Sequence, residues 1–149
     1  METNLTIEGA DPIFGRVKAR LGIIADAGYQ PFPNLLLIHQ HDLGLNSSQL
    51  NVLANIMMHR HNSAVLPFPH TKTIAARMGI EPRTVQAIIR QLADGGFIIK
   101  VKGTRRGEPA AYDIRPVLKK LEAYAKQRIA LVGERSFDEM PPGQLEALF

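Results

Sequence analysis

The sequence contains no cysteine and no apolar run long enough to span a bilayer, and each absence removes a class of protein. Without cysteine there is no disulfide framework and no thiolate chemistry. A membrane-spanning helix needs about 20 consecutive apolar residues, and no stretch approaches that length. The first twelve residues, METNLTIEGADP, also lack the basic segment and apolar run of a secretory signal. We therefore expect a soluble cytoplasmic protein with no membrane partner.

The sequence also lacks the common catalytic motifs. It has no GxSxG nucleophile turn, no HExxH zinc motif and no glycine-rich loop that ends in lysine and a hydroxyl residue. The segment GTRRG, residues 103–107, is basic and glycine-bounded but lacks the lysine and hydroxyl that hold phosphate and magnesium. We expect no enzyme, no catalytic residue and no cofactor.

The five histidines do not form a recognisable metal site. His39 and His41, like His59 and His61, are two residues apart, and such side chains point about 200° apart on a helix, so they cannot chelate one ion. His70 stands apart from both pairs. Scattered histidines are usually surface or boundary residues, so we expect no bound metal.

The positive charge of the chain is concentrated in one region. Residues 66–120 hold eleven Lys and Arg against four Asp and Glu, a net of +7, although the formal net charge of all 149 residues is only +4. Residues 1–65 have a net charge of −1 and residues 121–149 have −2. A basic region of this kind is suited to neutralising phosphates, which favours a nucleic-acid partner over a merely solvated surface.

The segment TKTIAARMGIEPRTVQAIIRQL, residues 71–92, predicts two helices separated by a tight turn. In the first helix Ile74, Ala75 and Met78 share one face, and Thr71 is placed to be its N-cap. Gly79 follows where a helix end favours positive φ. The chain is therefore expected to turn at this glycine and to begin a second helix at once.

The second helix, residues 82–93, has sharply divided faces. Pro82 suits its first turn. The buried stripe is expected to hold Val85, Ile88, Ile89 and Leu92. The outward face, which is basic and rich in hydrogen-bonding groups, is expected to hold Arg83, Thr84, Gln86, Ala87 and Arg90.

Residues 71–90 resemble the helix-turn-helix pattern of DNA-binding proteins. The matching positions are Ile74, Ala75, Met78, Gly79, Ile80, Val85 and Ile88. Small Ala75 allows close helix crossing, Gly79 makes the turn, and the remaining apolar residues lock the helices together. The resemblance implies that the second helix can lie in a DNA major groove.

The residues that follow predict a β-hairpin. FIIKVK, residues 97–102, and YDI, residues 112–114, are strand candidates on either side of a basic loop. Two helices followed by a hairpin resemble a winged helix, with Arg105 and Arg106 at the tip of the wing. We expect a mainly α fold with a small β-hairpin wing, an α+β winged helix-turn-helix.

The remaining segments divide the chain into four parts. Residues 1–33 are expected to be an N-terminal arm with one helix, whose apolar face would hold Ile13, Val17, Leu21 and Ile24. The DNA-binding domain would span residues 34–115, with a short helix capped by Asn34 and a longer one capped by Asn46 or Ser47. A C-terminal helix is expected over 116–134, and a flexible acidic tail over 135–149.

The C-terminal helix has two interpretations. Its apolar residues could form a homodimer seam, since many such proteins pair two modules on DNA, or they could pack on their own domain. The seam would hold Leu118, Leu121, Ala125 and Val132. The tail could dock on a partner protein through Leu145, Leu148 and Phe149.

Over residues 34–125 the chain is similar to helix-turn-helix domains of phage and plasmid replication proteins and of small regulators on bacterial mobile elements. We interpret it as a sequence-specific, nucleoid-associated binder of double-stranded DNA that regulates transcription; initiation of plasmid or phage replication is the alternative. Base contacts are expected from Arg83, Thr84, Gln86, Ala87 and Arg90. Phosphate contacts are expected from Thr71, Lys72, Lys102, Arg105 and Arg106.

A protein adaptor built on a winged helix is the alternative from another class. DNA binding requires Arg83, Arg90, Arg105 and Arg106 to converge on one exposed face. An adaptor would allow these arginines to scatter into salt bridges.

Overall fold

The computed structural model describes residues 12–59, 70–103, 106–107 and 110–132, and the chain divides into two units, residues 1–31 and 32–149. The first unit contains α1 (Pro12–Leu21) and a 3-10 helix, η1 (Gly22–Ala27). Gly22 has a φ of +59°, which ends the α-helix, so the expected single helix with Ile24 on its face is wrong after Leu21. Ala25 is the buried residue of η1.

The second unit begins with α2 (Asn34–Ile38) and α3 (Ser47–Met58). Asn46 caps α3 in a reciprocal pair: its side chain accepts from the Gln49 N–H at 2.8 Å, and its own N–H donates to Gln49 Oε1 at 2.9 Å. The prediction that Asn34 caps α2 is wrong, because Asn34 is the first helical residue and Pro33 precedes it. The apolar face of α3 is buried through Leu50, Leu53, Ile56 and Met57.

The predicted helix pair is present as α4 (Thr71–Met78) and α5 (Pro82–Asp94). Gly79 adopts a left-handed conformation with a φ of +67°, and the Ile80 N–H donates to the Ala75 carbonyl at 3.1 Å, which closes the end of α4. The helix begins one residue away from the prediction: His70 is the N-cap and Thr71 is the first helical residue, with no side-chain capping bond. The turn is confirmed, and the Thr71 cap is wrong.

A two-stranded antiparallel sheet follows, formed by β1 (Ile99–Val101) and β2 (Ala111–Asp113), with Lys100 opposite Tyr112. The first strand is shorter than the predicted 97–102 because Phe97 and Ile98 enter the core before the pairing begins, and the second has the predicted length but starts one residue earlier. The Phe97 N–H donates to the Leu92 carbonyl at 3.0 Å, and the Phe97 carbonyl accepts from the Val117 N–H at 2.9 Å. These two bonds tie the end of α5 to the start of the last helix.

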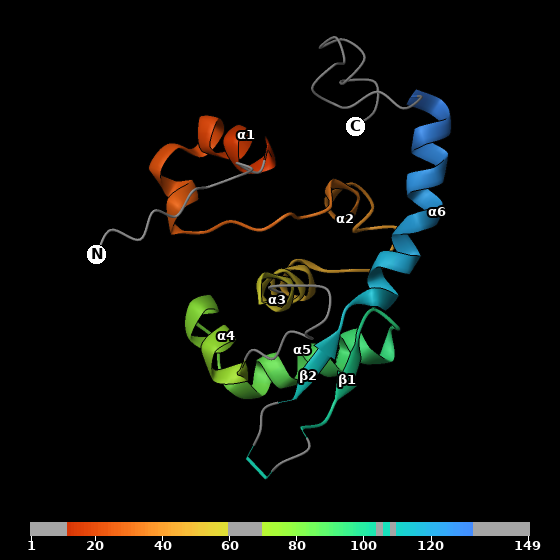
Figure 1. Ribbon diagram of the computed structural model, residues 1–149. Helices are drawn as coiled ribbons and strands as arrows, with labels where there is room; N and C mark the ends of the chain where they lie inside the picture. The colour runs from red at the N-terminus through yellow and green to blue at the C-terminus, as the bar shows by residue number, and fades with distance from the viewer. Residues whose placement is uncertain (1–11, 60–69, 104–105, 108–109, 133–149) are drawn as a thin grey trace, which may run out of the picture. The chain divides into compact units, whose positions relative to one another are not determined.

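That last helix is α6 (Arg115–Val132), drawn in blue in Figure 1. Val117 and Leu121 are buried in the core of the second unit, and Leu118 packs against it. Farther along, the Tyr124 ring stacks on His39 with centroids 3.9 Å apart, which joins α6 to the end of α2. Leu121 is therefore part of the domain's own core, so the homodimer seam predicted through it is wrong at this position. Ala125 is half-buried, and the side chain of Val132 lies outside the described residues.

The second unit is thus mainly helical with one small antiparallel sheet, in the order α2, α3, α4, α5, β1, β2, α6. In the ranges that the structure describes, no helix combines the length and the apolar content that crossing a bilayer requires.

Candidate nucleic-acid interface

Helix α5 presents an exposed polar face. All five residues predicted to read bases are exposed: Arg83, Thr84, Gln86, Ala87 and Arg90. The opposite face is buried as predicted, through Val85, Ile88, Ile89 and Leu92. In the described part of the chain, the side chains of Arg83, Gln86 and Arg90 form no ion pair or hydrogen bond, so their donors remain available to a ligand.

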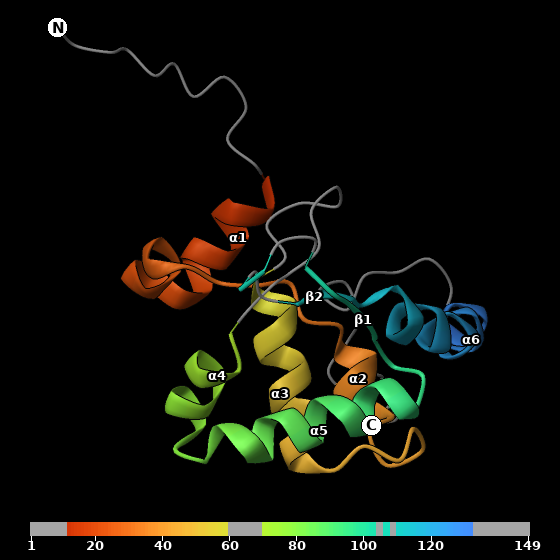
Figure 2. The same ribbon diagram turned by 90° about the horizontal axis from the view of Figure 1, so that it is seen from below.

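Packing and hydrogen bonds hold α5 in position. Figure 2 shows α5 crossing α3, with α4 joined to one end of it. Gln49 Nε2 of α3 donates to Gln91 Oε1 of α5 at 3.1 Å. At the end of α5, a Cβ on Gly95 would lie 2.8 Å from a ring carbon of Phe97, so only glycine leaves room for the aromatic ring there. A helix anchored on one side and at its end presents its other face in a defined orientation.

Three cations of the basic region have structural partners. Arg77 donates to Asn55 Oδ1 at 3.3 Å and lies 2.9 Å from His59 Nε2. Arg115 pairs with the buried carboxylate of Asp113, with Nη2 to Oδ2 at 2.6 Å; this hydrogen bond and charge raise the pKa of the guanidinium. Lys120 lies over the Phe97 ring, 5.1 Å from its centroid.

Seven other cations of this region are exposed and have no ion pair among the described residues: Lys72, Arg83, Arg90, Lys100, Lys102, Arg106 and, on α6, Lys119. The basic charge noted in the sequence is therefore partly structural and partly available. Four arginines were expected to distinguish a DNA-binding protein from an adaptor. Three of them, Arg83, Arg90 and Arg106, are among the exposed cations without an ion pair in the described residues. Arg105 lies outside the described residues.

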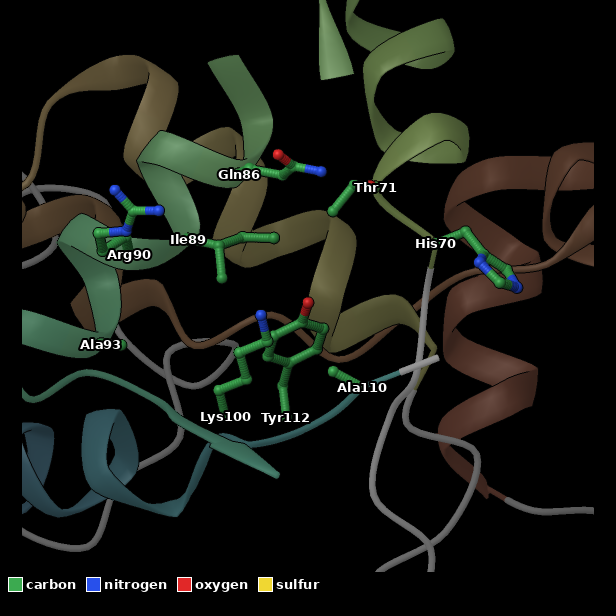
Figure 3. Close-up of a pocket in the computed structure, with 9 residues that line it drawn as sticks. All are labelled: His70, Thr71, Gln86, Ile89, Arg90, Ala93, Lys100, Ala110 and Tyr112. Atoms are coloured by element: carbon green, nitrogen blue, oxygen red, sulfur yellow. The ribbon is translucent and has the colours of Figure 1, made fainter. Parts of the chain in front are cut away.

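A cleft of about 500 Å³ lies between the start of α4, α5 and the hairpin. Its lining, drawn in Figure 3, consists of His70, Thr71, Gln86, Ile89, Arg90, Ala93, Lys100, Ala110 and Tyr112. Among the described residues, the lining includes two cations and no acidic side chain. The cleft is therefore electropositive, and it adjoins the outward face of α5.

Tyr112 is one of the residues that line this cleft. The side chain is almost fully buried, and burial raises the pKa of its phenol because the charged form loses solvation. The phenol consequently remains a neutral O–H donor at physiological pH.

The predicted phosphate contacts fall in different places. Thr71 is half-buried in the lining of the cleft, whereas Lys72, Lys102 and Arg106 are exposed. Sequence reasoning missed Lys100 and Tyr112. The position of Lys100 between the apolar residues Ile99 and Val101 was a signal for the first, but its pairing with Tyr112 depends on strand register, which a long loop does not specify.

The histidines have other contacts. His39 stacks on Tyr124 and lies 3.0 Å from Asp42 Oδ2, and His59 contacts Arg77. In the ranges with described structure, no three His, Asp or Glu side chains come together as a metal-binding group.

Comparison with known proteins identifies the domain. The DnaD N-terminal domain family matches residues 32–130. Over 126 residues the chain is 27% identical to the replicative helicase loading/DNA remodeling protein DnaD of Bacillus subtilis (strain 168); the alignment covers 83% of this chain and 52% of that protein. The chain thus spans about half the length of this curated relative.

Solved structures include the N-terminal domain of DnaD from Geobacillus kaustophilus HTA426, which is 26% identical with a TM-score of 0.53 and covers 79% of this chain and 98% of its own. A MarR-family transcriptional regulator from Rhodococcus sp. RHA1 is more distant: it is 17% identical, with a TM-score of 0.41 over 95% of this chain and 90% of its own. Because the family match covers 99 of the 149 residues, this chain belongs to the DnaD N-terminal domain family.

Proposed function

We propose that this chain is a winged helix-turn-helix module that binds duplex DNA in the initiation of replication, in support of helicase loading or DNA remodelling. The observation that carries the proposal is the outward face of α5, where Arg83, Gln86 and Arg90 are exposed and without partners in the described structure. Arginine and glutamine at such positions are the residues that pair with guanine and adenine edges.

The comparisons favour replication over transcriptional regulation, which was the first interpretation of the sequence. The curated relative is a helicase loading and DNA remodeling protein, and the solved structure with the TM-score of 0.53 is a DnaD domain. They point to this family and not to a mobile-element regulator. The proposed role needs DNA binding and positioning, and no catalysis by this chain.

Duplex binding by fluorescence anisotropy tests the proposal. Selection of bound duplexes from a random pool first supplies a preferred site. An Arg83→Ala, Arg90→Ala double variant should then lose most of its affinity for that site, because two charge-assisted contacts are removed. Lys119→Ala, Lys126→Ala is the matched control, since it removes two exposed cations from α6. Equal binding by both double variants would overturn the role of α5.

A protein adaptor is the second candidate, and one feature of the hairpin favours it. Ile99 and Val101 of β1 are both exposed, which is unusual for apolar residues two positions apart on one strand. The two functions predict different results in one assay. If the chain is an adaptor, it should have no measurable affinity for any selected duplex at low salt. If it is a DNA-binding module, it should bind the selected duplex under the same conditions.

Assembly as a homodimer is also a proposal. Leu121 is not available for a seam, so pairing through α6 would use its exposed second half, where Ile129 is 56% and Leu131 is 82% exposed. Analytical ultracentrifugation at tens of micromolar, with and without duplex, tests this. A protein that sediments as a monomer in both conditions removes the dimer. The predicted partner site at Leu145, Leu148 and Phe149 lies outside the described residues.

A further inference from the structure

We propose that the cleft between α4, α5 and the hairpin is a phosphate-binding site, in which Lys100, Tyr112 and the first turn of α4 hold the phosphate group. The phosphate can belong to the backbone of duplex DNA, in which case the inference rests on the proposed function and deepens it. It can also belong to a free nucleotide, in which case the site has its own ligand. Neither Lys100 nor Tyr112 was among the residues expected to bind DNA.

The strand register brings the first two donors together. Lys100 of β1 is directly opposite Tyr112 of β2, and paired residues of an antiparallel sheet project their side chains from the same face. In Figure 3 the ammonium end of Lys100 and the hydroxyl of Tyr112 both point into the cleft, toward Ile89. A cation and a neutral hydroxyl donor are therefore directed at one volume.

The hydroxyl of Tyr112 is a donor that opens onto the cleft. The residue is only 3% exposed, but its hydroxyl oxygen is not one of the enclosed, unsatisfied side-chain atoms of the described residues, so the oxygen itself is accessible. It has no hydrogen-bond partner among the described residues. Since the ring is enclosed and the hydroxyl faces the cleft, an acceptor placed in the cleft would complete the bonding of this side chain.

The start of α4 supplies further donors. The helix has no side-chain cap and no acidic residue in its first turn. The backbone N–H groups of Thr71 and Lys72 have no partner in the part of the chain that is described. Free N–H groups at a helix N-terminus, together with the helix dipole, favour an anion. Thr71 also lines the cleft, so this helix end opens onto the same volume as Lys100 and Tyr112.

The other lining residues define the class of ligand. Ile89, Ala93 and Ala110 form an apolar part of the wall, while Gln86 and Arg90 add donors from α5. The charged groups that line the cleft within the described part of the chain are all positive, so a cation is disfavoured. A volume of about 500 Å³ exceeds what one phosphate needs and lies within the range of roughly 300–1,000 Å³ that is usual for ligand pockets. A phosphate attached to a sugar or nucleoside fits this combination.

Nuclear magnetic resonance titration of the full chain with inorganic phosphate tests the site. Sodium chloride at matched ionic strength is the reference. The amide signals of Thr71, Lys72, Lys100 and Tyr112 should shift together with phosphate and not with chloride. Tyr112→Phe removes only the hydroxyl and should weaken phosphate binding about ten- to a hundredfold, as expected for one hydrogen bond to a charged group. Lys100→Met should weaken it at least as much.

Matched controls separate this site from general charge effects. Tyr124→Phe removes a tyrosine hydroxyl from α6, and Lys119→Met removes an exposed lysine from the same helix; neither residue lines the cleft. Both should bind phosphate as the parent does. The inference is overturned if phosphate moves the four amides no more than chloride does, or if the control variants weaken binding as much as Tyr112→Phe and Lys100→Met.

Two further probes identify the source of the phosphate. If the cleft holds the DNA backbone, Tyr112→Phe weakens binding to every duplex alike, and adenosine triphosphate binds no more tightly than inorganic phosphate. If the cleft holds a free nucleotide, adenosine triphosphate binds at least tenfold more tightly than inorganic phosphate, and duplex affinity does not change in Tyr112→Phe. Either result supports the site.

Failure of this inference differs from failure of the proposed function. If Tyr112→Phe loses phosphate binding but the Arg83→Ala, Arg90→Ala variant binds duplex as the parent does, the phosphate site in the cleft is supported and the DNA-binding role of α5 is rejected. If Tyr112→Phe binds phosphate as the parent does but the Arg83→Ala, Arg90→Ala variant loses duplex binding, the phosphate site is rejected and the DNA-binding role of α5 is supported.

Discussion

Helices α5 and α6 belong to the same unit, and both have apolar residues at helical spacing, but they use them differently. In α5 one side is buried along the length of the helix, and the other side is exposed and polar. In α6 the first half is anchored by Val117 and Leu121, and exposure increases toward the end, where Ile129 and Leu131 face solvent. The first helix is anchored along its whole length, and the second mainly at its start.

This difference shows what apolar periodicity can and cannot predict. The stripe of α5 identified its exposed face correctly, because a helix with sharply divided faces has only one way to bury its apolar side. In α6 the same spacing was compatible with a seam between two chains or with the core of one. The structure selects the core for Leu121, which lies there with a 4% exposed surface.

The largest effect is expected from Leu121→Ala in α6. Truncating a buried leucine leaves a cavity, so the free energy of unfolding should fall by about 2 to 5 kcal/mol in chemical denaturation. Ile129→Ala on the exposed half of the helix is the control and should change it by no more than about 0.5 kcal/mol. If instead Leu121→Ala altered sedimentation and left stability unchanged, α6 would be a seam after all.

The next effect concerns the polar face of α5. Arg83→Ala and Gln86→Ala should each weaken binding to a preferred duplex by about 1 to 3 kcal/mol and relax its sequence preference, because each removes a base contact. Both residues are exposed, so thermal stability should remain that of the parent. Lys119→Ala on α6 is the control for loss of one positive charge. A drop in stability equal to that of Leu121→Ala would mean that α5 is structural on both faces.

A smaller effect is expected where α3, which packs against α5, begins. Asn46→Ala removes the capping bond to the Gln49 N–H and should lower the free energy of unfolding by about 0.5 to 2 kcal/mol. Ser48→Ala, two residues further along, removes an exposed hydroxyl and should have almost no effect. Denaturation curves of the two variants provide the comparison, and equal stability would show that the cap contributes nothing.

The smallest effect is expected from Arg106→Ala in the loop between the strands. Loss of one phosphate contact should weaken binding to all duplexes alike and make the slope of log affinity against log salt shallower by about one unit. Anisotropy titrations at several salt concentrations measure this slope. An unchanged slope would restrict the DNA-binding surface to α5 and the cleft.

Residues 71–92 show how much of the fold could be predicted from the sequence. The two helices, the glycine turn and the buried stripe of α5 follow from interactions among near neighbours in the chain, and each is confirmed. The capping box of α3 is equally local, because Asn46 and Gln49 are three residues apart. Local steric and hydrogen-bonding requirements can be predicted from sequence because all the groups involved lie within a few residues of one another along the chain.

Only the tertiary structure determined which residues line the cleft and against which surface α6 packs. Lys100 and Tyr112 are separated by a loop whose length does not specify a register, so their pairing depends on how Phe97 and Ile98 enter the core. Thr71 joins them because α4 packs on α5. Likewise, the spacing of Leu118 and Leu121 predicted a buried face, but burial depends on which surface is available to cover it. The sequence determined which residues are apolar and where the chain turns; packing between distant segments determined which donors share a site.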